Sequence, residues 1–123
     1  MPIEGLNHYN VDTSRPNETI SFYCDVLGFV NRPNRRPDFG RPGAWLFVGD
    51  KALIHLNFVD DNRDGPTGAL NHIAFSGIDY DSTRTSLDDH GVSYQAVEST
   101  ERGFNQLFFK DPNNIRIEIN FPT

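Results

Sequence analysis

The strongest constraint in this sequence is an internal repeat of about half its length. Residues 52–58, Ala-Leu-Ile-His-Leu-Asn-Phe, align with residues 115–121, Ile-Arg-Ile-Glu-Ile-Asn-Phe. The tripeptide Leu-Asn-His that ends at His8 recurs ending at His72. The two offsets are 63 and 64 residues in a chain of 123. The repeat predicts two copies of one supersecondary unit, each too small to bury a core alone.

Each copy is predicted to run strand, helix, strand, strand, strand. Alternating polarity marks the strands, and clusters of Pro, Gly, Asn and Asp mark the turns. The first copy has strands at 5–12, 29–30, 45–48 and 52–59, with a helix that ends before Gly28. The second has strands at 69–76, 92–97, 104–109 and 115–121, with a helix at 81–90 that ends before Gly91. We interpret residues 1–123 as one α+β domain of two tandem βαβββ modules, at about 1–65 and about 66–123.

The first helix carries two more detailed predictions. Thr13 and Ser14 supply hydroxyl groups for a cap, and Pro16 suits the first turn. Apolar side chains then recur at the spacing of one helix face, which predicts the residues that face the core. These residues are Ile20, Tyr23, Cys24 and Leu27.

Composition excludes several classes of partner. The net charge of −6 argues against nucleic acid, because phosphate binding needs a basic surface. One cysteine leaves no internal disulfide. No apolar run reaches the ~18 residues that a membrane helix needs, and the first residues lack the pattern of a signal peptide. We therefore expect a cytoplasmic protein that binds neither nucleic acid nor membranes.

Four side chains at matching positions of the repeat are candidate metal ligands or proton carriers. His8 matches His72, and His55 matches Glu118. Each alone has an ordinary alternative, a structural histidine or a carboxylate facing water. Together, two imidazoles and a carboxylate suit a 2-His-1-carboxylate metal site with open positions for substrate.

Other polar residues are candidates for substrate binding. Period-two alternation places Asn57 on the face of His55 and Asn120 on the face of Glu118. Arg102 is a further candidate beside a glycine. The arginines of the loop from Arg32 to Arg41 form either a solvated segment or a lid that attracts an anionic substrate.

The sequence resembles the vicinal oxygen chelate superfamily of glyoxalase I, extradiol dioxygenases and bleomycin resistance proteins. Four segments carry the resemblance across the whole chain: Leu-Asn-His-Tyr-Asn-Val at 6–11, Phe-Tyr-Cys-Asp-Val-Leu-Gly-Phe at 22–29, Leu-Asn-His-Ile-Ala-Phe at 70–75, and Asp-Pro-Asn-Asn-Ile-Arg-Ile-Glu at 111–118. The resemblance implies paired βαβββ modules with open curved mixed sheets, a homodimer, and a divalent metal such as Fe, Mn, Zn or Ni.

The resemblance also assigns roles to individual residues. It implies that His8, His72 and Glu118 are the metal ligands and that His55 stands at a variable fourth position. Glyoxalase I carries Glu or Gln at that position, whereas extradiol dioxygenases carry a His that acts as acid and base. Those dioxygenases carry Tyr where this chain has Phe108, which we take as a candidate for substrate contact. Asn114 replaces the usual Gly of the Asp-Pro turn.

These residues leave several functions open. The first is an extradiol-type ring-cleaving dioxygenase in which His55 moves protons. The second is a glyoxalase-I-like isomerase or lyase. The third is a metal-free drug-binding protein of the bleomycin resistance type, and a thiol transferase acting on an epoxide antibiotic is a further alternative. Each would act on or bind a small molecule, and we expect each as a homodimer.

Overall fold

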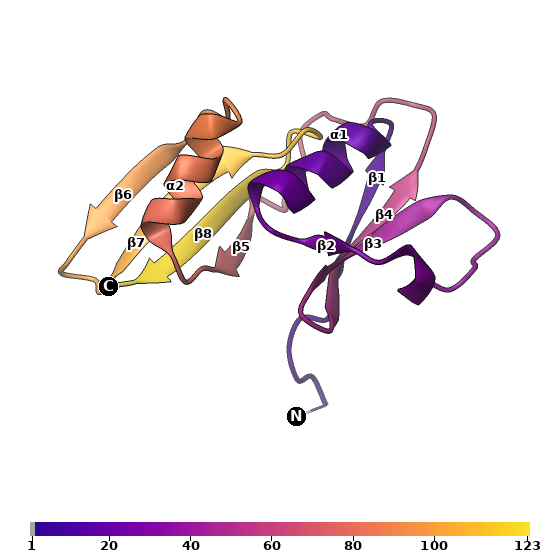
Figure 1. Cartoon of the computed structure of the whole chain (residues 1–123). Coiled ribbons are helices and arrows are strands. Elements are labelled where there is room, and N and C mark those ends of the chain that lie inside the picture. Colours follow the sequence, from indigo (N-terminus) through magenta and orange to yellow (C-terminus); the bar gives the residue numbers. More distant parts are fainter. Residues whose placement is uncertain (1) are drawn as a thin grey trace. The chain divides into compact units, whose positions relative to one another are not determined.

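Each half of the sequence folds around its own four-stranded sheet and one principal helix (Figure 1). The computed structural model describes residues 2–123, in two units that divide between Arg63 and Asp64. The first unit contains β1 (Tyr9–Thr13), α1 (Pro16–Ser21), η1 (Phe22–Val26), β2 (Val30–Asn31), η2 (Pro33–Arg35), β3 (Gly43–Val48) and β4 (Lys51–Phe58). The second contains β5 (Ile73–Ser76), α2 (Tyr80–Asp89), β6 (Gln95–Ser99), β7 (Phe104–Lys110) and β8 (Arg116–Pro122).

The two sheets have the same topology. Their strand orders are β1-β4-β3-β2 and β5-β8-β7-β6. In each unit the first and last strands pair in parallel, and the remaining pairs are antiparallel. Both sheets are therefore open and mixed, and the predicted order of strand, helix, strand, strand, strand is confirmed in both modules.

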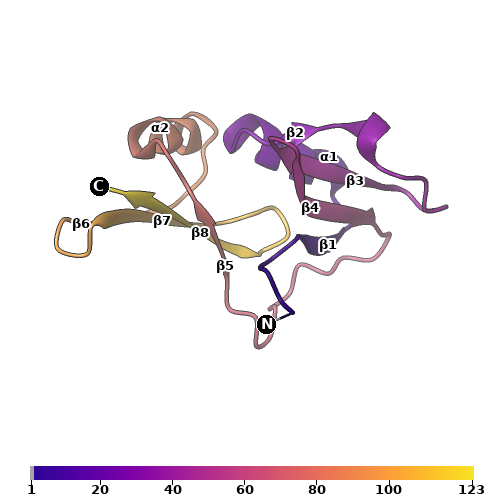
Figure 2. The ribbon, with the colours of Figure 1, turned by 90° about the horizontal axis from the view of Figure 1, so that it is seen from below.

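One face of each sheet is apolar and buried. Figure 2 shows α2 lying along one side of the sheet formed by β5 to β8. Burial of apolar surface there stabilises the fold by roughly 25 cal/mol per Å² removed from water. In the second unit the buried residues are Leu87, Leu107, Phe109, Ile117, Ile119 and Phe121, and in the first they include Val11, Ala44, Leu46, Ile54 and Leu56. The opposite face of each sheet is left for polar side chains.

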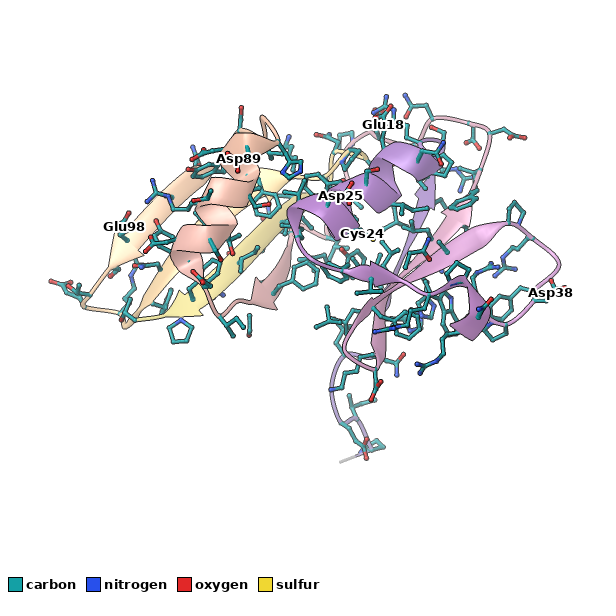
Figure 3. The ribbon with its side chains drawn as sticks, viewed as in Figure 1. Glu18, Cys24, Asp25, Asp38, Asp89 and Glu98 are labelled. Atoms are coloured by element: carbon teal, nitrogen blue, oxygen red, sulfur yellow. The ribbon has the colours of Figure 1, made fainter. Side chains whose placement is uncertain are left out.

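The predicted core face of the first helix is wrong, because the buried face is displaced by one residue along the sequence. Ile20, Cys24 and Leu27 are only half-buried (Figure 3 labels Cys24 on this helix). The buried side chains are Thr19, Phe22, Tyr23 and Val26. Both sets have helical spacing and share Tyr23, so the period alone could not choose between them. The π-helical turn at Phe22–Val26 also changes the spacing on which the prediction depended.

The start of this helix also differs from the prediction. Pro16 does occupy the first turn, but Arg15 precedes the helix and makes no side-chain cap. Thr13 ends β1 instead, and its hydroxyl accepts a hydrogen bond from the Arg15 amide at 2.9 Å. Pairing with Phe58 keeps Thr13 in the strand. Its hydroxyl therefore accepts from the Arg15 amide before the helix begins and does not cap the helix itself.

The first strand of each module is shorter than predicted. β5 begins at Ile73 and not at 69, because its partner β8 starts only at Arg116, after the Asp111–Asn114 turn. β1 likewise begins at Tyr9 and not at 5. His8 and His72 therefore each lie immediately before a strand.

Turn residues behave as their types predict. Gly28 and Gly91 have φ of 82° and 68°, so both helices end in left-handed backbone. Asn114 has φ of 67°, the left-handed conformation that asparagine tolerates. The Asp111 carboxylate accepts the amides of Asn113 and Ile115 at 2.8 and 2.9 Å, which fixes the turn leading into β8. Within residues 2–123, no helix is long and apolar enough to cross a membrane.

We predict that Gly77→Ala destabilises the second module. A Cβ at Gly77 would lie 2.4 Å from Phe121 and 2.7 Å from Ile119, two core side chains of β8. Overpacking of this kind costs about 1–3 kcal/mol. Gly65→Ala is the control, because a Cβ there meets nothing within 4 Å. Chemical denaturation measures both variants, and equal unfolding midpoints would show that the close approach at Gly77 is unimportant.

Candidate functional site

In the first module, strand pairing brings two of the predicted residues to one face of the sheet. Asn10 of β1 lies opposite His55 of β4 in a parallel register. His8 is two residues before Asn10 and so points to the same face. Trp45 of β3 is the register partner of His55 on its other side. The face opposite the core thus carries His8, Asn10, Trp45 and His55.

The second module repeats this arrangement with a different donor. Ala74 of β5 lies opposite Glu118 of β8, and His72 is two residues before Ala74. Phe108 of β7 is the register partner of Glu118 on its other side. His72 and Glu118 therefore occupy the same positions in their module as His8 and His55 do in theirs.

An asparagine precedes each of the two equivalent histidines and bonds to its ring. His8 Nδ1 lies 2.6 Å from Asn7 Oδ1, and His72 Nδ1 lies 2.7 Å from Asn71 Oδ1. A carbonyl oxygen can only accept, so Nδ1 must carry the proton in both rings. In a neutral ring the Nε2 lone pair is then available. This is the tautomer that metal-binding histidines adopt when a partner holds their other nitrogen.

His72 and Glu118 already face one another. His72 Nε2 lies 3.3 Å from Glu118 Oε1. Two ligands at right angles around a metal, each about 2.1 Å from it, are separated by about 3 Å. The amide nitrogen of Gln106 donates to Glu118 Oε2 at 3.4 Å, so one oxygen is held while the other faces the ring. Glu118 is 9% exposed and Arg116, two residues before it, is exposed.

His55 is the middle ring of an aromatic stack. Its centroid lies 3.7 Å from that of His8 and 4.1 Å from that of Trp45, with interplanar angles of 12° and 14°. Both ring faces are therefore covered, and only the ring edge can meet another molecule. Burial of the ring, followed by the neighbouring His8, holds the pKa of His55 below its ordinary value.

The remaining predicted residues lie in different surroundings. Asn57 donates to Asn10 and Asp12, both at 3.0 Å, on the face of His55. Asn120 has a buried Oδ1 with no hydrogen-bond partner, on the face of Glu118. Arg102 lies in the β6–β7 turn, with its guanidinium over Phe104. Phe104 pairs with Pro122 at the end of β8, four residues beyond Glu118. The structure therefore brings Phe108 and Asn120 near Glu118 but does not bring Arg102 there.

A cavity of about 410 Å³ opens beside His55 within the first module. It is lined by the rings of Trp45 and Phe47 and by three charged side chains, Arg35, Asp50 and Lys51. In the second module, Phe108 lines a cavity of about 440 Å³, with Arg116 over its ring at 5.1 Å. Aromatic surface beside each candidate pair could hold the apolar part of a small molecule.

Sequence reasoning missed several residues of this site. Asn7 and Asn71 were inside the repeated Leu-Asn-His tripeptide, so their recurrence was a usable signal. Trp45 and Gln106 gave no such signal, because only strand register brings them beside His55 and Glu118. Among residues 2–123, no group of three His, Cys, Asp or Glu side chains is placed to hold a metal ion. The four candidates occur as one pair in each module.

Comparison with known proteins agrees with this architecture. The profile of the Glyoxalase/Bleomycin resistance protein/Dioxygenase superfamily matches residues 5–119. The chain belongs to this superfamily. Its two open mixed sheets are the fold of the solved members, and the glyoxalase/dioxygenase from Nostoc punctiforme superposes with a TM-score of 0.80 at 17% identity. That match covers 99% of this chain and 93% of the other.

Two curated members of the superfamily are similar in sequence. The chain is 34% identical over 127 residues to "Glyoxylase I 4" of Arabidopsis thaliana, covering 97% of this chain and 71% of that protein. It is 29% identical over 126 residues to a metapyrocatechase of Geobacillus stearothermophilus, covering 97% of this chain and 37% of that protein. The superfamily membership predicted from the repeated motifs is confirmed.

We predict that the asparagine bonds set the tautomers of His8 and His72. Long-range ¹H–¹⁵N spectra of metal-free protein, recorded with both rings neutral, should show both rings protonated at Nδ1. Asn71→Leu removes the acceptor and should shift His72 toward the Nε2-protonated form while His8 is unchanged. Asn71→Asp keeps an oxygen acceptor and should retain the Nδ1 proton. A His72 signal that is the same in all three proteins would contradict this role for Asn71.

Proposed function

We propose that this chain is a divalent-metal-dependent enzyme acting on a small molecule with two adjacent oxygens. Extradiol-type ring cleavage of a catechol is the reaction that its residues fit best. The observation that carries the proposal is the repeated Asn–His pair, which places the proton of each neutral ring on Nδ1, together with Glu118 at 3.3 Å from Nε2 of His72. A structural histidine needs neither a fixed Nδ1 proton nor a carboxylate facing its other nitrogen.

We assign His8, His72 and Glu118 as the metal ligands. Two neutral imidazoles and one carboxylate fit Fe, Mn, Zn or Ni, and three protein ligands leave coordination positions for substrate. When bound, the metal would act as a Lewis acid toward the two substrate oxygens. Gln106 would hold Glu118 in place, and Asn7 and Asn71 would hold the two rings.

His55 is the residue to which we assign proton transfer. The rings of His8 and Trp45 cover both of its faces and the backbone of Ala52 hydrogen-bonds to its edge, so the imidazole is held in one orientation. A catechol must lose protons to chelate and regain one later, and a positioned imidazole suits that exchange. Phe108, Asn57 and Asn120 are the groups that we propose to contact the substrate body.

A glyoxalase-I-like isomerase or lyase is the second candidate. The 34% identity to "Glyoxylase I 4" over most of both chains favours it. Its reaction would also need a base beside the metal, and His55 would take that part. Glyoxalase I carries Glu or Gln at the position of His55, so the imidazole found here favours the dioxygenase. A metal-free binding protein of the bleomycin resistance type is a third candidate, and metal content separates it from both.

We further propose that the enzyme is a cytoplasmic homodimer. Each sheet is open, so β1 and β2 in one module and β5 and β6 in the other are edge strands. Unpaired edges favour association with another chain, and a twofold dimer is the commonest symmetry. A single cysteine, Cys24, which leaves no internal disulfide, fits a reducing compartment.

Glu118→Gln is predicted to weaken metal binding by more than about tenfold, because the amide removes the one negative charge among the three ligands. Glu98→Gln is the matched control in the same module, since Glu98 is exposed and accepts from Tyr80. Calorimetry with Fe(II), Mn(II), Zn(II) and Ni(II) measures both variants against the parent protein. Equal affinities for all three proteins would contradict Glu118 as a ligand.

His55→Ala is predicted to keep the metal but lose turnover by about 10²- to 10⁴-fold, the usual contribution of a general acid–base group. The assay loads Fe(II) without oxygen, adds a panel of catechols with O₂, and follows oxygen uptake and ring-cleaved product. Hemithioacetals with Ni(II) or Zn(II) test the second candidate in parallel. Isomerisation without oxygen uptake would favour the second candidate, and no stoichiometric metal in the purified protein would favour the third.

A further inference from the structure

The cavity beside His55 is lined by two cationic side chains and one carboxylate. Arg35 and Lys51 line it together with Trp45, Phe47 and His55. Asp50 is the acidic residue that also lines it, and none of the ion pairs found among residues 2–123 joins Asp50 to Arg35 or Lys51. Two cations and one anion therefore leave the lining of this cavity with a net positive charge.

The loop that supplies Arg35 concentrates positive charge in an acidic protein. Residues 31–43 contain four arginines and one aspartate, whereas the whole chain has a net charge of −6. The aspartate, Asp38, lies in the loop before β3 (Figure 3), and its carboxylate accepts the amide of Gly40 at 2.8 Å. The loop carries a net charge of about +3 by simple residue count, and Arg35 is its charged residue that lines the cavity.

Aromatic rings hold these arginines in place of carboxylates. The guanidinium carbons of Arg32 and Arg35 lie 5.7 and 5.2 Å from the centroid of the same ring, Phe47. Those of Arg36 and Arg41 both lie over Phe39, at 5.2 and 5.7 Å. Pairs of like charges on one ring repel each other, and cation–π contacts offset only part of that cost. A bound anion would relieve the repulsion.

We propose that this cavity binds a carboxylate carried by a planar, unsaturated substrate. Arg35 and Lys51 would bind the carboxylate, because charge-assisted hydrogen bonds to a guanidinium and an ammonium are the strong ones. Trp45 and Phe47 would contact the flat apolar part, which places that molecule beside His55. Describing the carboxylate as part of the substrate rests on the proposed function, whereas binding of the anion does not.

Trp45 provides a direct measurement because it is the single tryptophan of the chain. Its fluorescence is followed while the full-length protein is titrated with benzoate or with benzamide, which has the same ring and no charge. We expect benzoate to bind at least about tenfold more tightly, the effect of one good charge-assisted contact. Equal affinities, or no binding of either compound, would overturn the proposal.

Variants locate the charge that is responsible. The double variant Arg35→Gln with Lys51→Gln should abolish the preference for benzoate, and Arg35→Lys should retain most of it. Arg84→Gln is the control, since it removes one arginine from α2 of the second module, where the guanidinium lies over Tyr80. An unchanged preference in the double variant would overturn the proposal.

One further variant separates this inference from the proposed function. Glu118→Gln should keep the benzoate preference although it weakens metal binding, because the carboxylate is held by Arg35 and Lys51. Loss of the preference in Glu118→Gln would mean that benzoate binds the metal, and the anion site would be wrong. Conversely, the double variant Arg35→Gln with Lys51→Gln should bind Fe(II) as the parent does. The benzoate test therefore holds even if the proposed metal site is wrong.

Discussion

The parallel pairing of the first and last strand of each module is the interaction on which the rest of the structure depends. Two parallel neighbours cannot be joined by a tight turn and need a long connection, which in each module contains a helix and two strands. The helix covers one face of the sheet, and the apolar residues of that face form the core. The pairing also sets Asn10 opposite His55 and Ala74 opposite Glu118. The polar face, which needs no core packing, is then free to carry reactive groups.

The two modules use this shared frame for different chemistry. The second pairs His72 with Glu118 at 3.3 Å, an arrangement of nitrogen and carboxylate that suits a divalent metal. The first replaces the carboxylate with His55 and stacks it between His8 and Trp45. Stacking fixes the orientation of a ring without supplying charge. The two modules thus share the histidine before the first strand, His8 or His72, and differ at the second position, which is His55 in one and Glu118 in the other.

Electrostatics distinguishes the surroundings of the two pairs as well. The first module gathers four arginines in its longest loop, each held over a phenylalanine ring. In the second module Arg116 lies over Phe108, beside Glu118, whereas Arg84 and Arg102 lie over other rings. In a chain of net charge −6, such a local excess of positive charge would attract anions toward His55 and leave the rest of the surface unattractive to them. Substrate charge and metal binding are therefore assigned to different residues.

The sequence alone determined the duplication, the order of elements and the positions of the four candidate residues. Those features depend on local rules: alternation decided which residues share a face, and Gly28, Gly91 and Asn114 marked left-handed turns. It failed on the first helix, where Thr19 and Val26 are buried in place of Ile20 and Leu27, because two stripes had equal periodicity and a π-turn shifted the spacing. Only the tertiary structure decided which side chains touch. Trp45 reaches His55, and Gln106 reaches Glu118, through strand register between distant segments, which no local pattern encodes.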